Sequence, residues 1–222
     1  MCMTLAFALF LSAPTQQAKD NTPPEGFTAL FNGKDLTGWQ GLVELPKRDK
    51  DLEKYAAQVK AASEKDLPHW TVEDGVIHYK PRAHSLQTAK DYGDFELWVD
   101  WKIGAGGESG IYLRGQPQVQ IWDFTKNAVG SGGLYNNQKH AKDPVKCADK
   151  PIGQWNTFRI TMKGEVTNVW LNGEHVVVDT VLENYWERKA DPNKPVPATG
   201  PIELQDHGNE LWFKNIYIKE LK

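Results

Sequence analysis

The chain has 222 residues, of which 25% are charged and 11% are aromatic, and its formal net charge is −3 at pH 7. This length suffices for one all-β domain with a sizeable core, and a slightly acidic chain without a basic stripe is not expected to bind nucleic acid. The chain has two cysteines, Cys2 and Cys147. Cys2 lies in an N-terminal apolar segment that we expect to be cleaved off, which leaves one free thiol and excludes both a disulfide framework and a cysteine-rich metal site.

The first 18 residues contain an apolar run from Met3 to Leu11, and a polar segment follows. The run is too short to span a bilayer, but it has the length of the apolar core of a secretory signal. We therefore expect a signal peptide over residues 1–18, with cleavage near Ala13 or Ala18, although the positively charged start of such signals is missing. The alternative is a hydrophobic N-terminal strand. A signal peptide implies export to the periplasm or cell envelope, with residues 19–25 as a linker and no transmembrane span in the mature chain.

The next elements are short strands and one helix. Residues 26–40 contain a short strand, an Asn-Gly turn and a second apolar stretch. Between residues 46 and 66, apolar positions recur at spacings of three and four among many charges, namely Leu52, Tyr55, Ala56 and Val59. This pattern predicts a surface helix near residues 48–63. The segment HWTVEDGVIHYK then predicts a tight hairpin at Asp74-Gly75.

The rest of the chain alternates apolar and polar residues, as half-buried strands do. Strands are predicted in DFELWVDWKI, SGIYLRG, PQVQIWD, WNTFRITMKG, VTNVWLNGEHVVVD and NELWFKNIYIKEL. The segment VTNVWLNGEHVVVD holds two of these strands, joined by a turn at Asn172-Gly173. Many strands without βα repetition predict an all-β fold of two packed antiparallel sheets, so we expect residues 26–222 to form a single β-sandwich domain. Two long connections, residues 123–153 and 182–200, carry aromatic and amide side chains, which favours a functional role over disorder.

Several predicted strands carry large polar and aromatic side chains opposite their apolar residues. If these strands are neighbours in a curved sheet, their polar sides form a groove. Rings for stacking on pyranose faces, with amides and charges for hydroxyl groups, are the chemistry of carbohydrate recognition. The set consists of Glu96, Trp98, Asp100, Tyr112, Arg114, Gln118, Gln120, Trp122, Glu203, Gln205 and His207, with loop residues Tyr135, Asn136, Asn137, Glu183, Asn184, Tyr185 and Trp186 as walls.

The alternative interpretation of these residues is a sheet with one solvated side, on which cross-strand pairs of Glu and Arg stabilise the fold without any further role. Trp98 and Trp122 favour a ligand site, because large rings on a bare surface are unusual.

Motifs in a fixed order reveal a resemblance. The segments GFTALFNGKDLTGW, DFELWVDWKI, ESGIYLRG, PQVQIWD, GQWNTFRITMKG, VWLNGEHVV, GPIELQDHG and LWFKNIYIKEL follow one another as in the 3-keto-disaccharide hydrolase family, which the chain resembles over residues 26–222. The resemblance implies a concanavalin A-like jelly-roll sandwich of two antiparallel sheets. It also implies an enzyme that cleaves the glycosidic bond of 3-keto-glycosides or 3-keto-disaccharides. Many members carry Glu where this chain has Gln118, so any acid or base role of that Glu either passes to another group in this chain or is absent from it.

The implied chemistry differs from the two-carboxylate route of ordinary glycosidases. A keto group at C3 acidifies the proton at C2, a base removes that proton, the enolate forms, and the C1 substituent leaves by elimination. The reaction is then either a lyase reaction, which ends at this step, or a hydrolysis, in which water adds to the product. This route needs a base and a donor to the enolate oxygen. On the resemblance, Arg114 would hold the keto oxygen and the base would be one of three residues, Glu203, His207 or Asp123. The hydroxyl groups of the sugar would be bound by Gln120 and Gln205, with Trp98, Gln118 and Trp122 as further contacts.

A divalent cation such as calcium is conceivable at Asp123 and Glu203, but the sequence has no dedicated calcium loop and no cofactor is predicted. The alternative functions are a non-catalytic carbohydrate-binding domain of the cell envelope and an envelope protein whose polar face meets another protein.

Overall fold

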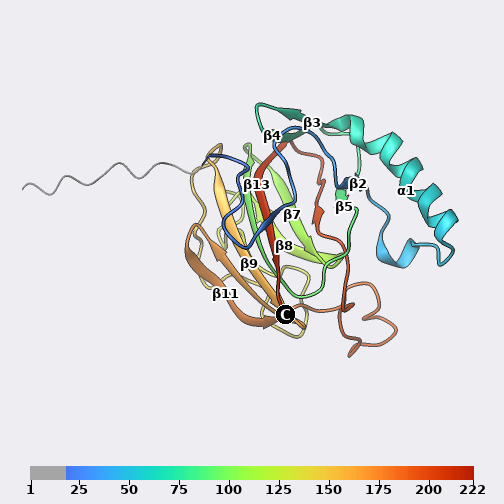
Figure 1. Ribbon diagram of the computed structural model, residues 1–222. Helices are drawn as coiled ribbons and strands as arrows, with labels where there is room; N and C mark the ends of the chain where they lie inside the picture. Colours follow the sequence, from blue (N-terminus) through green and yellow to red (C-terminus); the bar gives the residue numbers. More distant parts are fainter. Residues whose placement is uncertain (1–18) are drawn as a thin grey trace, which may run out of the picture.

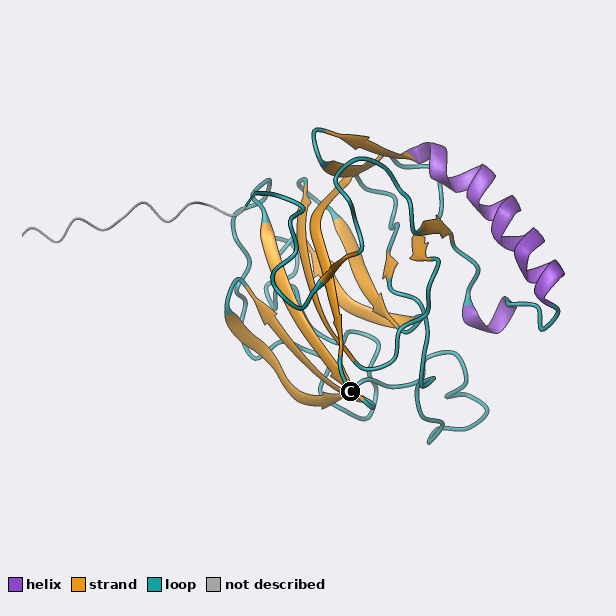
Figure 2. Ribbon diagram, viewed as in Figure 1, coloured by secondary structure: helices purple, strands orange, loops and turns teal. Residues whose placement is uncertain are grey.

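The computed structural model describes residues 19–222, so the predicted signal peptide lies outside the described residues. Two antiparallel sheets make up the body of the protein, with one helix at its side (Figure 1). Strands form both layers, and long loops lie around their ends (Figure 2). The predicted all-β sandwich with one surface helix is confirmed.

The larger sheet has eight strands. They are β1 (Thr28–Ala29), β3 (Trp70–Glu73), β4 (Val76–Tyr79), β6 (Phe95–Ile103), β9 (Asn156–Lys163), β10 (Val166–Leu171), β11 (Glu174–Val181) and β13 (Leu211–Glu220). Their order is β11-β10-β9-β6-β13-β4-β3, and β1 pairs with β13. The hairpins predicted at Asp74-Gly75 and Asn172-Gly173 connect β3 to β4 and β10 to β11. In each turn the non-glycine residue has positive φ, which Asp and Asn tolerate well.

The smaller sheet has five strands. They are β2 (Trp39–Gly41), β5 (Leu86–Thr88), β7 (Glu108–Leu113), β8 (Gln116–Trp122) and β12 (Glu203–Leu204). Their order is β2-β5-β12-β7-β8. The chain therefore places β12, from near its C-terminus, between two strands from its first half.

The core lies between the two sheets and is built from the apolar sides of their strands. On β6 the alternation is complete, because five side chains of one side are buried: Phe95, Leu97, Val99, Trp101 and Ile103. The five-stranded sheet faces them with Leu86, Ile111, Leu113, Val119, Ile121 and Leu204. Each such side chain contributes about 1.5–3 kcal/mol through removal of apolar surface from water. Ile202 and Leu204 of the GPIELQDHG segment belong to this core, as their alternation predicted.

The helix α1 (Leu52–Asp66) follows a short 3-10 turn, η1 (Leu45–Lys47), and leads into a second, η2 (Leu67–His69). Its predicted apolar stripe is only partly correct, since Leu52 at the start of α1 is 82% exposed. The helix lies beside the edge strand β2 (Figure 1). A Cβ on Gly41 would lie 2.4 Å from the carbonyl carbon of Ala62, so this close contact requires glycine.

In the described part of the chain, no helix has both the length and the apolar character needed to cross a bilayer.

Within residues 19–25, predicted as a linker, Asp20 and Asn21 bind to the sandwich. The backbone N–H groups of Asn21 and Asn215 each donate to the side-chain oxygen of the other residue, at 2.6 and 3.0 Å. Asn21 also donates to the carbonyl of Gly75 at 2.8 Å, and Lys214 pairs with Asp20 at 2.6 Å. The prediction of a linker rested on composition alone, which does not show that Asn21 pairs with Asn215 at the other end of the chain.

Candidate functional site

A row of polar side chains crosses the outer side of the five-stranded sheet and is centred on Glu203 of β12. Glu203 pairs in register with Gln87 of β5 on one side and with Tyr112 of β7 on the other, and Gln40 of β2 pairs with Gln87. Directly opposed residues of antiparallel strands share one side of a sheet, with Cβ atoms about 4.5–5.5 Å apart. We refer to the surface formed by this row and its neighbours as the polar face; it comprises Gln40, Gln87, Tyr112, Gln118, Gln120, Glu203 and Gln205.

The side chains of Gln118 and Gln205, next to this row, pack against the backbone of Gly110. The side chain of Gln205 donates to the hydroxyl of Tyr112 at 3.3 Å, and Gln118 donates to Gln120. Between them lies Gly110, where a Cβ would come within 2.9 Å of Gln118 and 3.0 Å of Gln205. A side chain at this position would separate the amides, so Gly110 allows the polar face to assemble.

The centre of the polar face is buried yet incompletely hydrogen-bonded. Glu203 is only 2% exposed, and its carboxyl group has no hydrogen bond or ion pair within residues 19–222. Two neighbouring amide atoms, Nε2 of Gln87 and Oε1 of Gln205, are also buried without a partner in the described chain. A buried polar group without a hydrogen-bond partner destabilises the fold by about 1–3 kcal/mol. Three such groups lie close together here, namely the donor of Gln87, the acceptor of Gln205 and the carboxyl of Glu203, so their presence needs an explanation. A polar ligand would satisfy all three.

Burial changes the protonation of the central acid. It raises the pKa of Glu203 to about 8; the positive charge of Arg48 opposes this rise and the negative charge of Glu44 adds to it. Burial also raises the pKa of Tyr112, and the charge of Glu203 raises it further. Near neutral pH the tyrosine is therefore neutral, and the glutamic acid can take up or release a proton close to the ambient pH, as an efficient general acid or base does.

The segment before α1 covers one end of the polar face. Arg48 donates to both carboxylate oxygens of Asp91, at 3.1 and 2.8 Å, and to Oε1 of Gln87 at 3.5 Å. Leu45 lies over the turn between β7 and β8, where a Cβ on Gly115 would be 2.7 Å from it. The segment thus supplies a cation and an apolar cover at the Glu203 end. The sequence did not reveal Arg48 or Gln87 as site residues. Arg48 fell in a segment predicted to be a solvated surface helix, and Gln87 lies in β5, which is too short to show an alternating pattern.

The other end of the polar face is more open. Nδ1 of His207 lies 3.5 Å from a carboxylate oxygen of Glu108, and both side chains are partly exposed. Trp122 donates its indole N–H to the carbonyl of Gly130 at 2.6 Å, and its ring meets that of Tyr135 edge-on at 5.2 Å. Of the three residues predicted to share one strand, only Glu203 lies in β12; Gln205 and His207 follow β12 and continue from the closed end of the surface to its open end.

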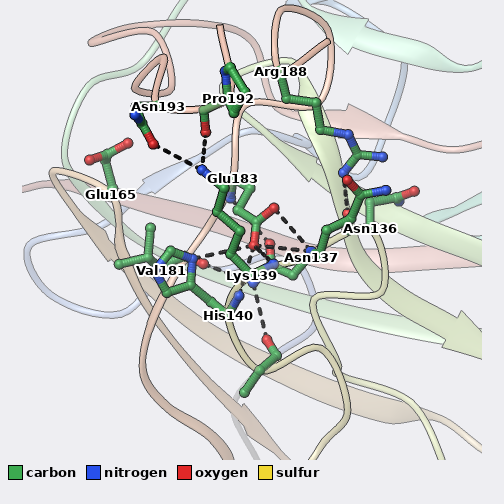
Figure 3. A network of polar contacts seen from close by, with 12 residues as sticks. Asn136, Asn137, Lys139, His140, Glu165, Val181, Glu183, Arg188, Pro192 and Asn193 are labelled. Carbon is green, nitrogen blue, oxygen red and sulfur yellow. Dashed lines mark hydrogen bonds and ion pairs between the residues drawn. The ribbon is translucent and has the colours of Figure 1, made fainter.

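The two long loops are tied to each other by the network in Figure 3. The Glu183 carboxylate accepts hydrogen bonds from three consecutive backbone N–H groups, those of Gln138, Lys139 and His140, at 2.7–3.0 Å. Although burial favours the neutral acid, these bonds keep the pKa of Glu183 below its usual range. A cavity of about 340 Å³ lies beside this network, lined by Glu183 and by both loops.

The remaining loop candidates take part in the same anchoring. Asn137 is buried and donates to the carbonyls of Val181 and Ala141, while the carbonyl of Asn136 accepts from Arg188. Trp186 donates to the carbonyl of Gly115 at 2.8 Å. Asn136, Asn137, Glu183 and Trp186 therefore hold the loops together and in place, and none of them belongs to the polar face.

Trp98 is not on the polar face, although the sequence predicted that it would be. It belongs to β6, together with Glu96 and Asp100, and β6 lies in the eight-stranded sheet. Alternation identifies the side chains that share one side of a strand, but it does not assign the strand to a sheet.

Arg114 and Asp123 also differ from their predicted roles. Arg114 is 2% exposed in the turn after β7, where it pairs with Asp94 and donates to the carbonyls of Gly93 and Gly164 at 2.8 and 2.9 Å. Asp123 follows β8 and accepts from Thr125 and from the N–H of Gly106, which lowers the pKa of Asp123. Both side chains use their polar groups to hold turns, so neither is available on the polar face.

Asp123 and Glu203, which the sequence suggested as calcium ligands, are too far apart along the sheet to share one ion. Tyr112 pairs with Glu203, whereas Glu108 pairs with Trp122, the residue before Asp123, so the two acids lie toward opposite ends of β7. Within residues 19–222 no group of three His, Cys, Asp or Glu side chains is arranged to hold a metal ion.

Comparison with known proteins supplies the substrate chemistry of relatives. A family model described as the 3-keto-alpha-glucoside-1,2-lyase-like domain matches residues 26–219. The chain is 25% identical to the 3-keto-disaccharide hydrolase of Bacteroides thetaiotaomicron, over 89% of this chain and 79% of that protein.

Two crystal structures from Parabacteroides distasonis, both of proteins inferred to be glycosyl hydrolases, share the fold. One has a TM-score of 0.66 and 28% identity, over 92% of this chain and all of the other. The second has a TM-score of 0.68 and 25% identity, over 89% of this chain and 85% of the other.

Proposed function

This chain belongs to the 3-keto-alpha-glucoside-1,2-lyase-like domain family, and we propose that it cleaves the glycosidic bond of 3-keto-glycosides on the polar face. The observation that carries the proposal is the buried, unpaired carboxyl of Glu203, with a pKa of about 8, among amide groups that lack partners. The family and the B. thetaiotaomicron relative suggest the substrate class. The geometry suggests which residues act on it.

In the proposed reaction Glu203 is the base. Its carboxylate takes the proton from C2, which the neighbouring C3 keto group acidifies. The electron pair of the C2–H bond moves toward the keto oxygen and gives an enolate. When the enolate collapses, the C1–O bond breaks and the leaving group departs with a proton, so that cleavage is an elimination across C1 and C2. Addition of water to the resulting double bond makes the net reaction a hydrolysis. A pKa near 8 suits this role, because the group is a strong enough base and is still partly ionised at neutral pH.

The donor to the enolate oxygen is assigned to Tyr112 in place of Arg114. Its hydroxyl accepts a hydrogen bond from Gln205, which leaves its own proton free to be donated. Tyr112 is the cross-strand partner of Glu203, so base and donor are adjacent, as this chemistry requires. Arg48 adds positive charge at the same end and favours both the carboxylate and the enolate.

The open amide atoms are assigned to the hydroxyl groups of the sugar. Nε2 of Gln87 offers a donor and Oε1 of Gln205 offers an acceptor, both buried. At the open end, His207 beside Glu108 is placed to exchange protons with the leaving group or with water. A site that hydrogen-bonds hydroxyl groups with buried atoms rejects analogues that lack those groups strongly.

The test is turnover of both anomers of a p-nitrophenyl 3-keto-glucoside, with the unoxidised glucosides as matched substrates. We expect release of p-nitrophenol from a keto substrate only, and a loss of about 10²–10⁴-fold in Glu203→Gln. Glu25→Gln, which changes an exposed acid, is the matched control and is expected to behave as the wild type. Turnover of the unoxidised glucosides, full activity of Glu203→Gln, or binding without turnover would contradict the proposal; the last result identifies a carbohydrate-binding domain.

We also propose that the protein is exported. The support is the apolar run from Met3 to Leu11 and the polar segment after it. Export predicts that the chain recovered from the periplasm or cell envelope begins after Ala13 or Ala18, which N-terminal sequencing detects. An intact N-terminus on protein from the cytoplasm would contradict export.

A further inference from the structure

The outer side of the eight-stranded sheet carries a row of aromatic rings around one arginine. Trp98 of β6, Arg159 of β9 and Trp170 of β10 are in register and therefore share this side. His175 of β11 extends the row, with its ring stacked on Trp170 at 4.1 Å. This surface belongs to the other sheet and is separate from the polar face.

A hollow of about 320 Å³ lies in this row, and its lining consists of Trp98, Thr157, Arg159, Trp170 and Gly173. Its volume is at the lower end of the range of small-molecule sites, about 300–1,000 Å³. Trp170 is held in place from both sides, since the guanidinium of Arg159 lies 4.4 Å from its ring centroid and His175 stacks on it. The hollow is therefore built from side chains that are already fixed, which lowers the entropic cost of binding.

The unused hydrogen-bond donors in the hollow indicate the charge of the ligand. Glu96 accepts from the indole N–H of Trp98 at 2.8 Å and from Nε of Arg159 at 2.6 Å. Despite the opposing effect of burial, these contacts keep the pKa of Glu96 below its usual range, so it remains a carboxylate. They also fix one edge of the guanidinium. Its two terminal nitrogens donate no hydrogen bond within the described chain, and the side chain is 43% exposed. Two parallel N–H donors of arginine match the two oxygens of a carboxylate.

We propose that this hollow binds an acidic sugar residue, with its ring against Trp98 and its carboxylate on Arg159. Cross-strand stacking of Arg159 on Trp170 stabilises the sheet, but it does not require a hollow beside the guanidinium. The site is a binding site and not a reaction centre, because no acid or base lines it. The inference stands independently of the proposed function, since it uses no residue of the polar face.

The ligand test compares methyl β-D-glucuronide with methyl β-D-glucoside, which differ only in the carboxylate at C6. Both are titrated into the ¹⁵N-labelled chain while the indole N–H signals of Trp98 and Trp170 are followed by two-dimensional NMR. The glucuronide is expected to shift both signals and to bind at least about tenfold more tightly than the glucoside. Equal affinities, or no shift of either signal with the glucuronide, would overturn the proposal.

Two variants assign the binding to the hollow. Arg159→Gln is expected to weaken glucuronide binding at least about tenfold, whereas the matched control Lys102→Gln, on the same side but outside the hollow, leaves it unchanged. Gly173→Asn instead narrows the hollow and leaves Arg159 intact. Asparagine tolerates a positive φ such as the +87° of Gly173, and no atom lies within 4 Å of the position of the new Cβ. Wild-type affinity in either folded variant would refute the assignment. Turnover of the 3-keto-glucoside is measured in parallel and is expected to be unaffected, which separates this test from that of the proposed function.

Discussion

Replacing Glu203 by glutamine is expected to stabilise the protein while it removes the proposed base. Burial raises the pKa of this carboxyl from 4.5 to about 8, so the folded chain holds a proton that the unfolded chain releases. Below pH 4.5 the group is protonated in both states and carries no cost. Between pH 4.5 and 8 the free energy of unfolding of the wild type falls, relative to Glu203→Gln, by about 1.4 kcal/mol per pH unit. The accumulated difference is about 3 kcal/mol at pH 7 and about 5 kcal/mol above pH 8.

The assay is urea denaturation of the wild type, Glu203→Gln and Glu25→Gln at pH 5, 6, 7 and 8. The other titrating groups cancel in the difference between wild type and variant, so this difference isolates the buried carboxyl. We expect it to grow by about 4 kcal/mol from pH 5 to pH 8 for Glu203→Gln and to stay constant for the exposed control. Parallel curves for Glu203→Gln and the wild type would refute the inference that this acid is desolvated in the folded chain.

Two further substitutions test the surroundings of Glu203, and a third tests the structural role assigned to Arg114. Arg48→Gln removes a cation that favours the carboxylate, so the pKa of Glu203 and the acidic, ascending limb of the pH–rate profile should move to higher pH; an unmoved limb would argue against their coupling. Gly110→Ala places a Cβ 2.9 Å from Gln118 and should cost about 1–3 kcal/mol by overpacking and reduce turnover; wild-type KM and kcat would show that the amides need not be in contact. Arg114→Gln removes a buried charge-assisted network and should lower the free energy of unfolding by about 3 kcal/mol in urea denaturation; a folded variant of full stability that has lost turnover would restore this residue to the site.

Much of the sandwich could be predicted, because strand formation here depends on local alternation. The buried side of β6 and the two turns at Asp74-Gly75 and Asn172-Gly173 followed directly from residue type and spacing. The exposed Leu52 shows the limit of the method: it fits the helical period, but it is the first residue of α1 and its side chain faces solvent.

The candidate site could be predicted only in part, for a reason that concerns sheets. Glu203, Gln205 and Gln118 lie together as expected, because β12 and β8 both flank β7. Trp98 has the same alternation but lies in a strand of the other sheet, and pairing between strands far apart in sequence is not encoded in local periodicity. Arg114 appeared to continue a strand, whereas its positive φ places it in the turn that follows. Nothing in its local pattern reveals that distinction.

The covering segment shows what alternation cannot detect at all. Arg48 lies outside every strand, and its relevance depends on Asp91 and Gln87, which are about forty residues away in the chain. The buried, unpaired state of Glu203 likewise depends on elements that pack over it from elsewhere. A strand with Glu and Gln on one side is ordinary, and only the three-dimensional environment turns that carboxyl into a group with a pKa of about 8.

The most direct test of the central claim follows the proton at C2. A 3-keto-glucoside that carries deuterium at C2 is cleaved by the wild type and by Glu203→Gln, and the label is followed by NMR, with free 3-keto-glucose as the control for uncatalysed exchange. Removal of this proton by Glu203 predicts that the wild type transfers the deuterium to water as the glycosidic bond breaks, and that Glu203→Gln leaves both the label and the bond in place. Cleavage that leaves the deuterium at C2, or label loss at the wild-type rate in Glu203→Gln, would contradict the account.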